Sequence, residues 1–235
     1  MKFNRLMVIG AVALATAGFL LTRSFAAESS KAPKADVQRG AQIVASGTDY
    51  GVVPCARCHA FDGAADGSGA FPKLSGIPTY YLEKQLRDFA SGLRTDAIMS
   101  AIARKMKVED IADVSEYYSG VRGTPTPAPS ASPDMLALGA RLATVGDEAK
   151  KIQACEGCHG AGGRGESPAI PPLAGQYAHY IAFQMRMWQM SYRKNDANQQ
   201  MANIARKLSP QDIEAVGLYF ERLPQQHVAK NKRQP

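Results

Sequence analysis

Apolar residues recur every three or four positions in three segments of the chain, and all three segments return about 100 residues later. The first segment covers 36–45 and returns at 135–144, and each copy has an acidic residue near its start. The other two cover 79–91 and 108–119, and they return at 178–192 and 210–222. The pattern predicts six helices, so we expect an all-α fold that is built twice.

Residues between the helices repeat as well. The loop FPKLSG at 71–76 matches IPPLAG at 170–175. Side chains recur in the same order, as in the pairs Tyr81 and Tyr180, Gln85 and Gln184, Asp110 and Asp212, and Ile111 and Ile213. Small differences in the spacing of these matches indicate insertions in loops. The chain is therefore predicted to be a tandem repeat.

The domain boundary is marked by a change in composition. In residues 124–133 prolines alternate with small residues, which prevents helix formation and favours an extended spacer. We therefore place one domain at 34–123 and the other at 134–224, each of about 90 residues and large enough to fold. Residues 225–235 form a basic tail.

Two glycines occupy matching positions in the first helix of each domain. Gly40 and Gly139 are these residues, and the last helices end in the aromatic pairs Tyr117-Tyr118 and Tyr219-Phe220. A small residue permits two helices to approach closely, so we expect the first and last helices to cross with glycine against aromatic. An ordinary helical core would make the same contacts.

The first thirty residues differ from the rest of the chain, whose 45% hydrophobic and 21% charged composition is that of a globular protein rather than a disordered, collagenous or multi-span membrane protein. Lys2 and Arg5 precede an apolar stretch at 6–21, and small residues follow near Ala26. This order predicts a signal peptide at 1–26. A retained anchor is the alternative, but the stretch is shorter than the roughly 20 residues of a spanning helix.

The charge changes little of this picture. Removal of the signal segment takes away Lys2, Arg5 and Arg23 and no acidic residue, so the net charge falls from +7 to +4. The surplus lies in the second half and partly in the basic tail. A basic tail is usually a solvated end, and no basic stripe is interleaved with aromatic residues, so we do not expect nucleic-acid binding.

All four cysteines fall in two C-x-x-C-H pentapeptides. The residues are Cys55, Cys58 and His59 in the first and Cys155, Cys158 and His159 in the second. Two thiols on one helical turn can each add to a vinyl group of the same porphyrin, and the adjacent histidine then lies beneath the iron. The sequence therefore predicts two covalently bound haem c groups, with the four cysteines as attachment sites and the histidines as axial ligands.

Three other roles of cysteine fit less well. A zinc site needs its four ligands around one ion, but the two clusters are 100 residues apart and fall in separate repeats. A thioredoxin-like pair or a structural disulfide leaves the histidine after both pairs unexplained.

The sixth iron ligand decides between an open catalytic haem and a closed electron-transfer haem. Met99 and Met201 are the methionines that recur in both repeats, and they lie 40 and 42 residues after the predicted histidine ligands. We therefore predict that they are the second axial ligands. The alternative is that both are core residues near the haem. At the other repeated positions an apolar side chain suffices, as in the pairs Met106 and Leu208, Met185 and Leu86, and Met190 and Ser91.

Further candidates lie around the predicted haems. A backbone carbonyl at Pro72 or Pro171 could accept the Nδ1–H of the proximal histidine and orient its ring, although both prolines could simply form turns. His179 aligns with Tyr80 and His227 lies beyond the last helix, so neither is a convincing ligand. The cluster Met185, Met187, Trp188 and Met190 predicts core packing, with haem-edge or interdomain contact as the alternative.

In combination these motifs resemble the cytochrome c4 family over residues 36–224. The resemblance is carried by the paired C-x-x-C-H motifs, the Pro-x-Leu-x-Gly loops, the Tyr-x-x-x-Gln helices and the repeated methionines. It implies two tandem class I cytochrome c-like domains, each around one haem. Two departures, Met106-Lys107 for Leu-Ser and Pro172 for lysine, leave the ligands intact but put surface recognition in doubt.

What the resemblance implies about function is a periplasmic carrier of single electrons between respiratory complexes, from a quinol-oxidising complex to a terminal oxidase or reductase. We expect no catalytic residues. A cytochrome subunit of a dehydrogenase is the first alternative, and a dihaem redox enzyme is the second. Association with a membrane through a partner or an uncleaved N-terminus stays open.

Overall fold

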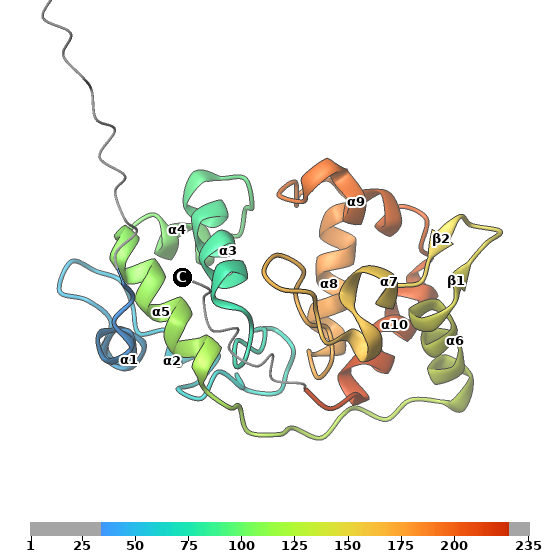
Figure 1. Ribbon diagram of the computed structural model, residues 1–235, viewed down its shortest axis with the longest axis horizontal. Coiled ribbons are helices and arrows are strands. Elements are labelled where there is room, and N and C mark those ends of the chain that lie inside the picture. The colour runs from blue at the N-terminus through green and yellow to red at the C-terminus, as the bar shows by residue number, and fades with distance from the viewer. Residues whose placement is uncertain (1–33, 226–235) are drawn as a thin grey trace, which may run out of the picture. The chain divides into compact units, whose positions relative to one another are not determined.

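The computed structural model describes residues 34–225, so the predicted signal segment 1–26 and the tail residues 226–235 lie outside the described part. Helices dominate it, and the two copies of the repeat form two helical groups (Figure 1), coloured blue to green and yellow to red. Within residues 34–225, no helix has the length and apolar character needed to cross a membrane.

The elements of the two halves follow one plan. The first half contains α1 (Val37–Ser46), α2 (Ala56–His59), α3 (Thr79–Ser91), α4 (Met99–Ala103) and α5 (Val108–Gly120). The second contains α6 (Pro133–Thr144), α7 (Glu156–His159), α8 (Ala178–Gln189), α9 (Gln200–Ala205) and α10 (Pro210–Arg222), with the short 3₁₀ turns η1 (Ala161–Gly163) and η2 (Ala197–Gln199). An antiparallel pair, β1 (Gly146–Asp147) and β2 (Ile152–Gln153), occurs in the second half.

The six predicted helices are present, with small differences at their ends. The helix predicted at 178–192 ends at Gln189, because Ser191 takes a positive φ of 59° that a helix cannot continue through. The helix predicted from 135 begins at Pro133, because the Ser132 side chain caps it. The β1–β2 pair was not predicted, since four residues without alternation leave no readable strand pattern.

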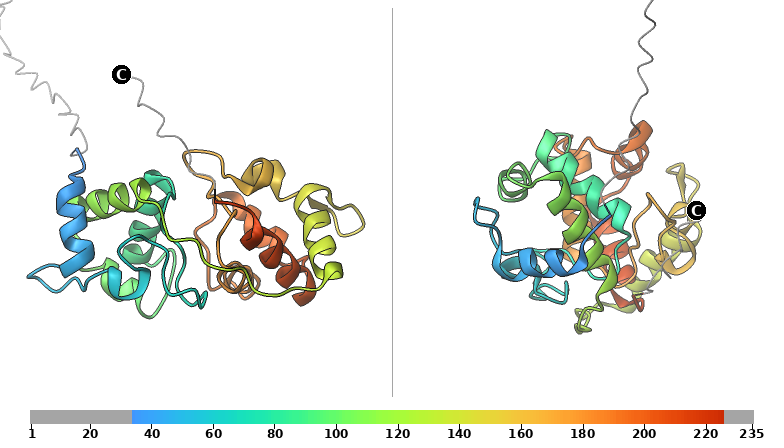
Figure 2. Two further views of the ribbon diagram at one scale, coloured as in Figure 1. Left: turned by 90° about the horizontal axis from the view of Figure 1, so that it is seen from below. Right: turned by 60° about the vertical axis from the view of Figure 1, so that its left-hand side comes forward.

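Each half has its own hydrophobic core between its first, middle and last helices. In the first half α5 packs on α1 and α3, and in the second half α10 packs on α6 and α8. Two views turned from Figure 1 show the same grouping (Figure 2). The largest buried side chains are Val44 and Tyr118 in the first core, and Leu142, Ile213 and Phe220 in the second.

The predicted contact of glycine with the last helix is present in both halves. A Cβ built on Gly40 would lie 2.3 Å from the Asp113 carbonyl oxygen and 3.2 Å from the Cβ of Tyr117. A Cβ on Gly139 would lie 2.1 Å from the Ala215 carbonyl oxygen. At these glycines the backbones of the first and last helices are in direct contact. No side chain fits there, so the requirement for glycine is stricter than the predicted contact with an aromatic ring.

A buried aspartate fixes the start of each last helix. The Asp110 carboxylate accepts hydrogen bonds from the Lys107 N–H, the Tyr50 hydroxyl and the Arg39 guanidinium. Burial alone would raise the pKa of Asp110, but these bonds outweigh it and hold the pKa below its usual value. Asp212 has the same role in α10, through Ser209 and Lys150. In the first half Arg39 thus also joins α1 to the start of α5, whereas in the second half Lys150, which lies between β1 and β2, makes the corresponding bond to α10.

The proposed linker at 124–133 forms no helix up to Ser132, and hydrogen bonds hold it at two points. The Thr124 hydroxyl and N–H both donate to the Asp62 carboxylate in the first half. The Arg222 guanidinium of the second half donates to the Pro129 carbonyl oxygen at 2.8 Å. These bonds fix the position of the linker against both halves.

Replacing Gly40 by alanine tests the helix crossing. We expect Gly40→Ala to lower the free energy of unfolding by about 1–3 kcal/mol, because the new methyl group overpacks against the α5 backbone. Thermal unfolding of the haem-loaded protein measures the change. Gly157→Ala is the control, because nothing lies within 4 Å of a Cβ there. Equal stability of the two variants would contradict the inferred packing.

Candidate haem sites

Each C-x-x-C-H motif forms one short helical turn. The first cysteine, Cys55 or Cys155, stands at the N-terminal boundary of α2 or α7, and the second lies inside the turn. All four thiols are free in the structure. Burial raises the pKa of Cys55 and of Cys155 to about 11, because both thiols border the hydrophobic cores. The surroundings suit an apolar ring attached through sulfur better than an exposed thiolate.

The two histidines end these turns with their rings buried. His59 and His159 are each 7% exposed. Nδ1 of His59 lies 3.2 Å from the Pro72 carbonyl oxygen, and Nδ1 of His159 lies 2.8 Å from that of Pro171. Burial lowers the pKa of both histidines, and the carbonyl contact opposes it only in part. The imidazoles are therefore neutral, and within residues 34–225 no hydrogen bond involves their Nε2 atoms.

The proline loops are held by the last helices. The Gly76 N–H donates to the Tyr118 carbonyl oxygen at 3.0 Å, and the Gly175 N–H donates to that of Phe220 at 2.8 Å. Both acceptors lie near the end of α5 or α10. The helix that crosses the glycine thus also fixes the loop whose proline carbonyl contacts the histidine.

The methionines begin or nearly begin two short helices. Met99 is the first residue of α4 and Met201 the second of α9, and both are partly buried. The Asp96 carboxylate accepts the Met99 N–H at 2.8 Å, and the Asp196 carboxylate accepts the Ala202 N–H at 3.1 Å. Each aspartate therefore orients the turn that carries a methionine.

Two extra residues separate Asp196 from Met201, in comparison with the first half. They are accommodated by positive φ angles of 55° at Asn198 and 54° at Gln199. They account for two of the three residues by which the repeat offset grows between the loop at 170–175 and this methionine, and the third lies between Arg193 and Asp196.

The other sequence candidates take different places. His179 is exposed, and its Nδ1 lies 3.3 Å from the Ser68 carbonyl oxygen of the first half. Met185 and Trp188 belong to the second core, as expected, whereas Met190 is 56% exposed. Met187 lines a cavity together with Arg94 of the first half, so it lies near the boundary between the halves, as the interdomain alternative expects. His227 lies outside the described residues.

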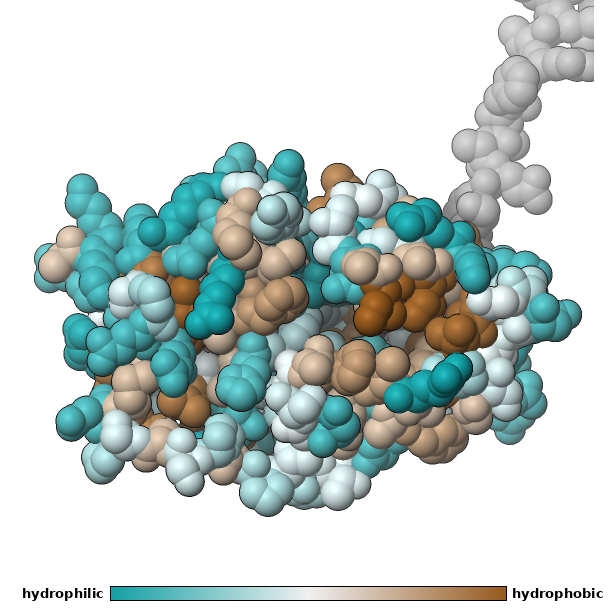
Figure 3. All heavy atoms as spheres, turned by 180° about the vertical axis from the view of Figure 1, so that it is seen from behind, coloured by the Kyte–Doolittle hydropathy of each residue, from teal (hydrophilic) through white to brown (hydrophobic). Residues whose placement is uncertain are grey.

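These residues fit a covalent haem in each half. A neutral buried imidazole, a pair of thiols one turn apart and a partly buried thioether border a hydrophobic core, which is the donor set and surface that haem c requires. Seen from behind, strongly apolar side chains line a hollow in the first half, at the right of the view, and smaller apolar areas open on the second half (Figure 3).

Comparison with known proteins agrees with this donor set. The sequence profile of the family described as cytochrome c matches residues 143–223. The thiosulfate dehydrogenase electron acceptor of Stutzerimonas stutzeri (strain A1501) is 36% identical over 184 residues, which cover 78% of this chain and 85% of that protein. Cytochrome c4 of Pseudomonas aeruginosa is 35% identical over 171 residues, which cover 72% and 83% of the two chains.

The chain belongs to the cytochrome c4-like family of dihaem cytochromes. It carries two covalently bound haem c groups and is a dihaem electron carrier rather than an enzyme. These conclusions confirm the predicted fold, cofactors and absence of catalytic activity.

Solved structures of cytochrome c4-like proteins match the fold. Reduced cytochrome c4 from Pseudomonas stutzeri is 31% identical, with a TM-score of 0.71, and the match covers 81% of this chain and all of that one. Thiosulfate dehydrogenase from Marichromatium purpuratum is 33% identical, with a TM-score of 0.75 over 80% of this chain. The match spans 40% of the Marichromatium chain, so the present chain is similar to one part of that longer protein.

Sequence reasoning missed Arg94 and Arg193, which this cytochrome buries between its two halves. Each is 6% exposed and contacts side chains of both halves. They recur at the same offset as Gln85 and Gln184, so comparison of the repeats could have found them. Asp96 and Asp196, which orient the methionine turns, were missed in the same way.

One residue next to a histidine is strained. Ala60 ends α2 with φ 58° and ψ 164°, a conformation that its counterpart Gly160 adopts with φ 74° and ψ 157°. We expect Ala60→Gly to raise the free energy of unfolding by about 1 kcal/mol, because glycine has no Cβ to strain there. Denaturant unfolding measures it. The control Ala56→Gly, inside the same helical turn, should lower stability, and destabilisation by both would contradict the inferred strain.

Proposed function

We propose that His59 with Met99, and His159 with Met201, are the axial ligands of the two haem irons. The two ligand sets are arranged alike, which supports this assignment. Each methionine lies in the first turn of a short helix, and the carboxylate of a preceding aspartate accepts a backbone N–H of that helix. The four cysteines are the attachment sites. The carbonyl oxygens of Pro72 and Pro171 accept the histidine Nδ1–H and so fix the rings and direct Nε2 to the iron.

This ligand set suits electron transfer. A bound haem c supplies a one-electron iron couple, and two protein ligands close its coordination sphere. The proline carbonyl keeps each imidazole in one tautomer, while the neutral thioether raises the reduction potential relative to a second imidazole. The core around the thiols excludes water from the ring.

We further propose that the electron donor is a dehydrogenase of the thiosulfate-oxidising class. The observation that carries this proposal is the similarity over 80% of the chain to a thiosulfate dehydrogenase structure, together with 36% identity to an acceptor of that enzyme. Dehydrogenases remove electrons from their substrates in pairs, and two one-electron haems can take up such a pair. The earlier alternative, a dehydrogenase subunit, is thus favoured over a general carrier.

The second candidate is a free carrier between a quinol-oxidising complex and a terminal oxidase or reductase. The similarity to cytochrome c4 of Pseudomonas aeruginosa favours it. For either role we infer a periplasmic location, which covalent haem attachment and the predicted signal segment at 1–26 support. The two candidates share one chemistry and differ in the donor.

Replacement of each methionine tests the ligand assignment. We expect Met99→Leu or Met201→Leu to remove half of the near-infrared methionine-to-iron band and to let one haem per chain bind carbon monoxide, because leucine cannot ligate iron. Absorption spectra with haem quantified per chain measure both effects. The controls are Met106→Leu, whose repeat partner is Leu208, and Met190→Leu, which is exposed. A full band in either ligand variant would refute the assignment.

Stopped-flow reduction tests the donor. We expect the oxidised protein to be reduced rapidly when thiosulfate and a thiosulfate dehydrogenase are both present, with two electrons taken up per chain. Either component alone should give no reduction. The competing donor is a quinol-oxidising complex supplied with quinol.

The two donors give opposite results. Reduction by the dehydrogenase at least ten times faster than by the quinol-oxidising complex supports the proposed role, and co-purification of the two proteins would make the acceptor a permanent subunit. The reverse order of rates favours the free carrier and rejects the dehydrogenase as the donor.

A further inference from the structure

The peptide group between Pro72 and Lys73 is held from two sides. Its carbonyl oxygen, which belongs to Pro72, accepts the Nδ1–H of His59 at 3.2 Å. Its N–H, which belongs to Lys73, donates to Oε1 of Gln176 at 3.0 Å. Gln176 is a residue of the second half, so the second half directly binds the peptide group that orients the histidine of the first half.

The Gln176 side chain is itself fixed. Its Nε2 donates to the Lys73 carbonyl oxygen at 3.0 Å, and its Oε1 also accepts the Tyr177 N–H at 3.1 Å. The neighbouring Tyr177 strengthens the contact, because its ring centre lies 4.5 Å from Nζ of Lys73 and its hydroxyl donates to the Ala64 carbonyl oxygen at 2.6 Å. The loop of the first half is therefore held against the second half through both backbone groups of Lys73.

The matching loop of the second half lacks this contact. Pro172 stands where the first half has a lysine, and proline has no N–H to donate. Within residues 34–225, no hydrogen bond from the first half reaches the loop at 170–175. Other bonds hold the two loops alike, since the N–H groups of Leu74 and Leu173 each donate to a glycine carbonyl oxygen at 2.8 Å. The two halves thus compare a loop with the Gln176 contact and a loop without it.

The histidine hydrogen bonds differ between the halves. The distance from Nδ1 to the proline carbonyl oxygen is 3.2 Å at His59 and 2.8 Å at His159. The carbonyl oxygen and the N–H of a trans peptide point in opposite directions, so a bond to the N–H restrains the carbonyl oxygen from approaching the imidazole. A bond of 3.2 Å is at the long, weak end of the normal range. A weaker bond at Nδ1 makes the imidazole a less basic ligand.

We propose that Gln176 is a positioning residue through which the second half raises the reduction potential of the first haem. It acts through the Pro72–Lys73 peptide group on His59, and a less basic imidazole stabilises ferric iron less. Because the contact is one-sided, its effect falls on one haem only. The inference rests on the proposed ligation of the first haem iron by His59 and is independent of the electron donor.

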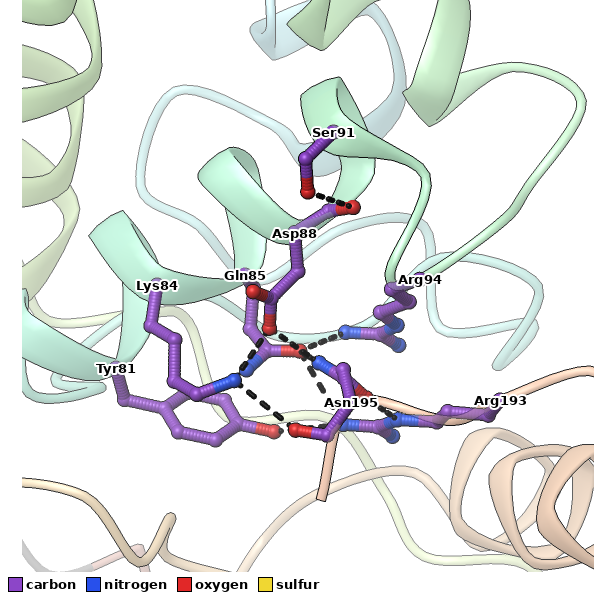
Figure 4. A network of polar contacts seen from close by, with 8 residues as sticks. All are labelled: Tyr81, Lys84, Gln85, Asp88, Ser91, Arg94, Arg193 and Asn195. Carbon is purple, nitrogen blue, oxygen red and sulfur yellow. Dashed lines mark hydrogen bonds and ion pairs between the residues drawn. The ribbon is translucent and has the colours of Figure 1, made fainter. Parts of the chain in front are cut away.

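Docking of the halves does not depend on Gln176 alone. A separate network joins α3 of the first half to the segment before η2 of the second (Figure 4). In this network the Asn195 amide donates to Gln85 at 3.0 Å and to Asp88 at 2.6 Å. Replacement of Gln176 therefore releases the peptide group while other contacts between the halves remain.

Spectropotentiometric titration of Gln176→Met in the dihaem protein tests the inference. Methionine has nearly the same shape as glutamine but cannot bind both backbone groups. We expect the released carbonyl oxygen to approach His59, so that the oxidised-to-reduced ratio of the first haem at a fixed ambient potential rises about threefold. At 59 mV per tenfold change, this is a fall of about 28 mV in its potential. The potential of the second haem should not change.

Two variants of Lys73 separate the loss of the N–H from the loss of the charge. Lys73→Pro gives the first loop the Pro-Pro sequence of the second and removes the N–H, whereas Lys73→Gln removes the same charge and keeps the N–H. We expect the ratio to be about threefold higher in Lys73→Pro than in Lys73→Gln. The control for docking is His179→Ala, because His179 is exposed and contacts Ser68 of the first half instead of the loop at 71–76. It should match wild type.

Nuclear magnetic resonance of the reduced protein, labelled with nitrogen-15 histidine, gives a second readout. We expect the Nδ1–H resonance of His59 to move downfield in Gln176→Met and Lys73→Pro, because its hydrogen bond shortens, while that of His159 stays in place. An unchanged or raised potential of the first haem, equal shifts of both haems, or a fixed His59 resonance would each overturn the inference. A wild-type protein without the methionine-to-iron band or without two haems per chain would instead refute the proposed ligands, and the inference with them.

Discussion

The close approach of the first and last helices, which only glycine permits, is the constraint on which each haem site depends. Gly40 sets α5 directly against α1, and a carbonyl oxygen near the end of α5 then accepts the N–H of Gly76. The same loop places the Pro72 carbonyl oxygen 3.2 Å from Nδ1 of His59. The second half repeats this chain of contacts through Gly139. Backbone packing of the first and last helices therefore helps to set the orientation of the imidazole.

The sequence alone was sufficient to predict those features of the structure that depend on one residue type at a fixed spacing. The histidines, cysteines and repeated methionines could be proposed from the sequence because haem attachment and ligation permit few substitutes. The helices followed from apolar periodicity, which the last helix at 210–222 matches without change. The β1–β2 pair was not predictable, since it arises from the turn between two segments of two residues each. Arg94 and Arg193 were passed over because their partners are neutral side chains of both halves, which no charge pattern reveals.

The two halves have the same order of helices, but they differ in the contacts that they make with each other. The Gln176 side chain accepts the Lys73 N–H and donates to the Lys73 carbonyl oxygen, both at 3.0 Å. The reverse contact cannot form, because the repeat places Pro172 at the matching position, where there is no N–H, and Ile77 opposite it. This substitution, which first raised doubt about surface recognition, makes the contact between the loops one-sided. The two haem sites therefore differ in their surroundings although their donor sets are the same.

The interface network has a consequence for assembly of the protein. Apolar packing completes each half by itself, since every large core side chain lies within one repeat. The surface between the halves instead contains amides, hydroxyls and two buried guanidinium groups, and each guanidinium donates to side chains of both halves. A buried guanidinium that loses one of these acceptors is left with an unsatisfied donor, so directional bonds rather than apolar area specify how the halves dock.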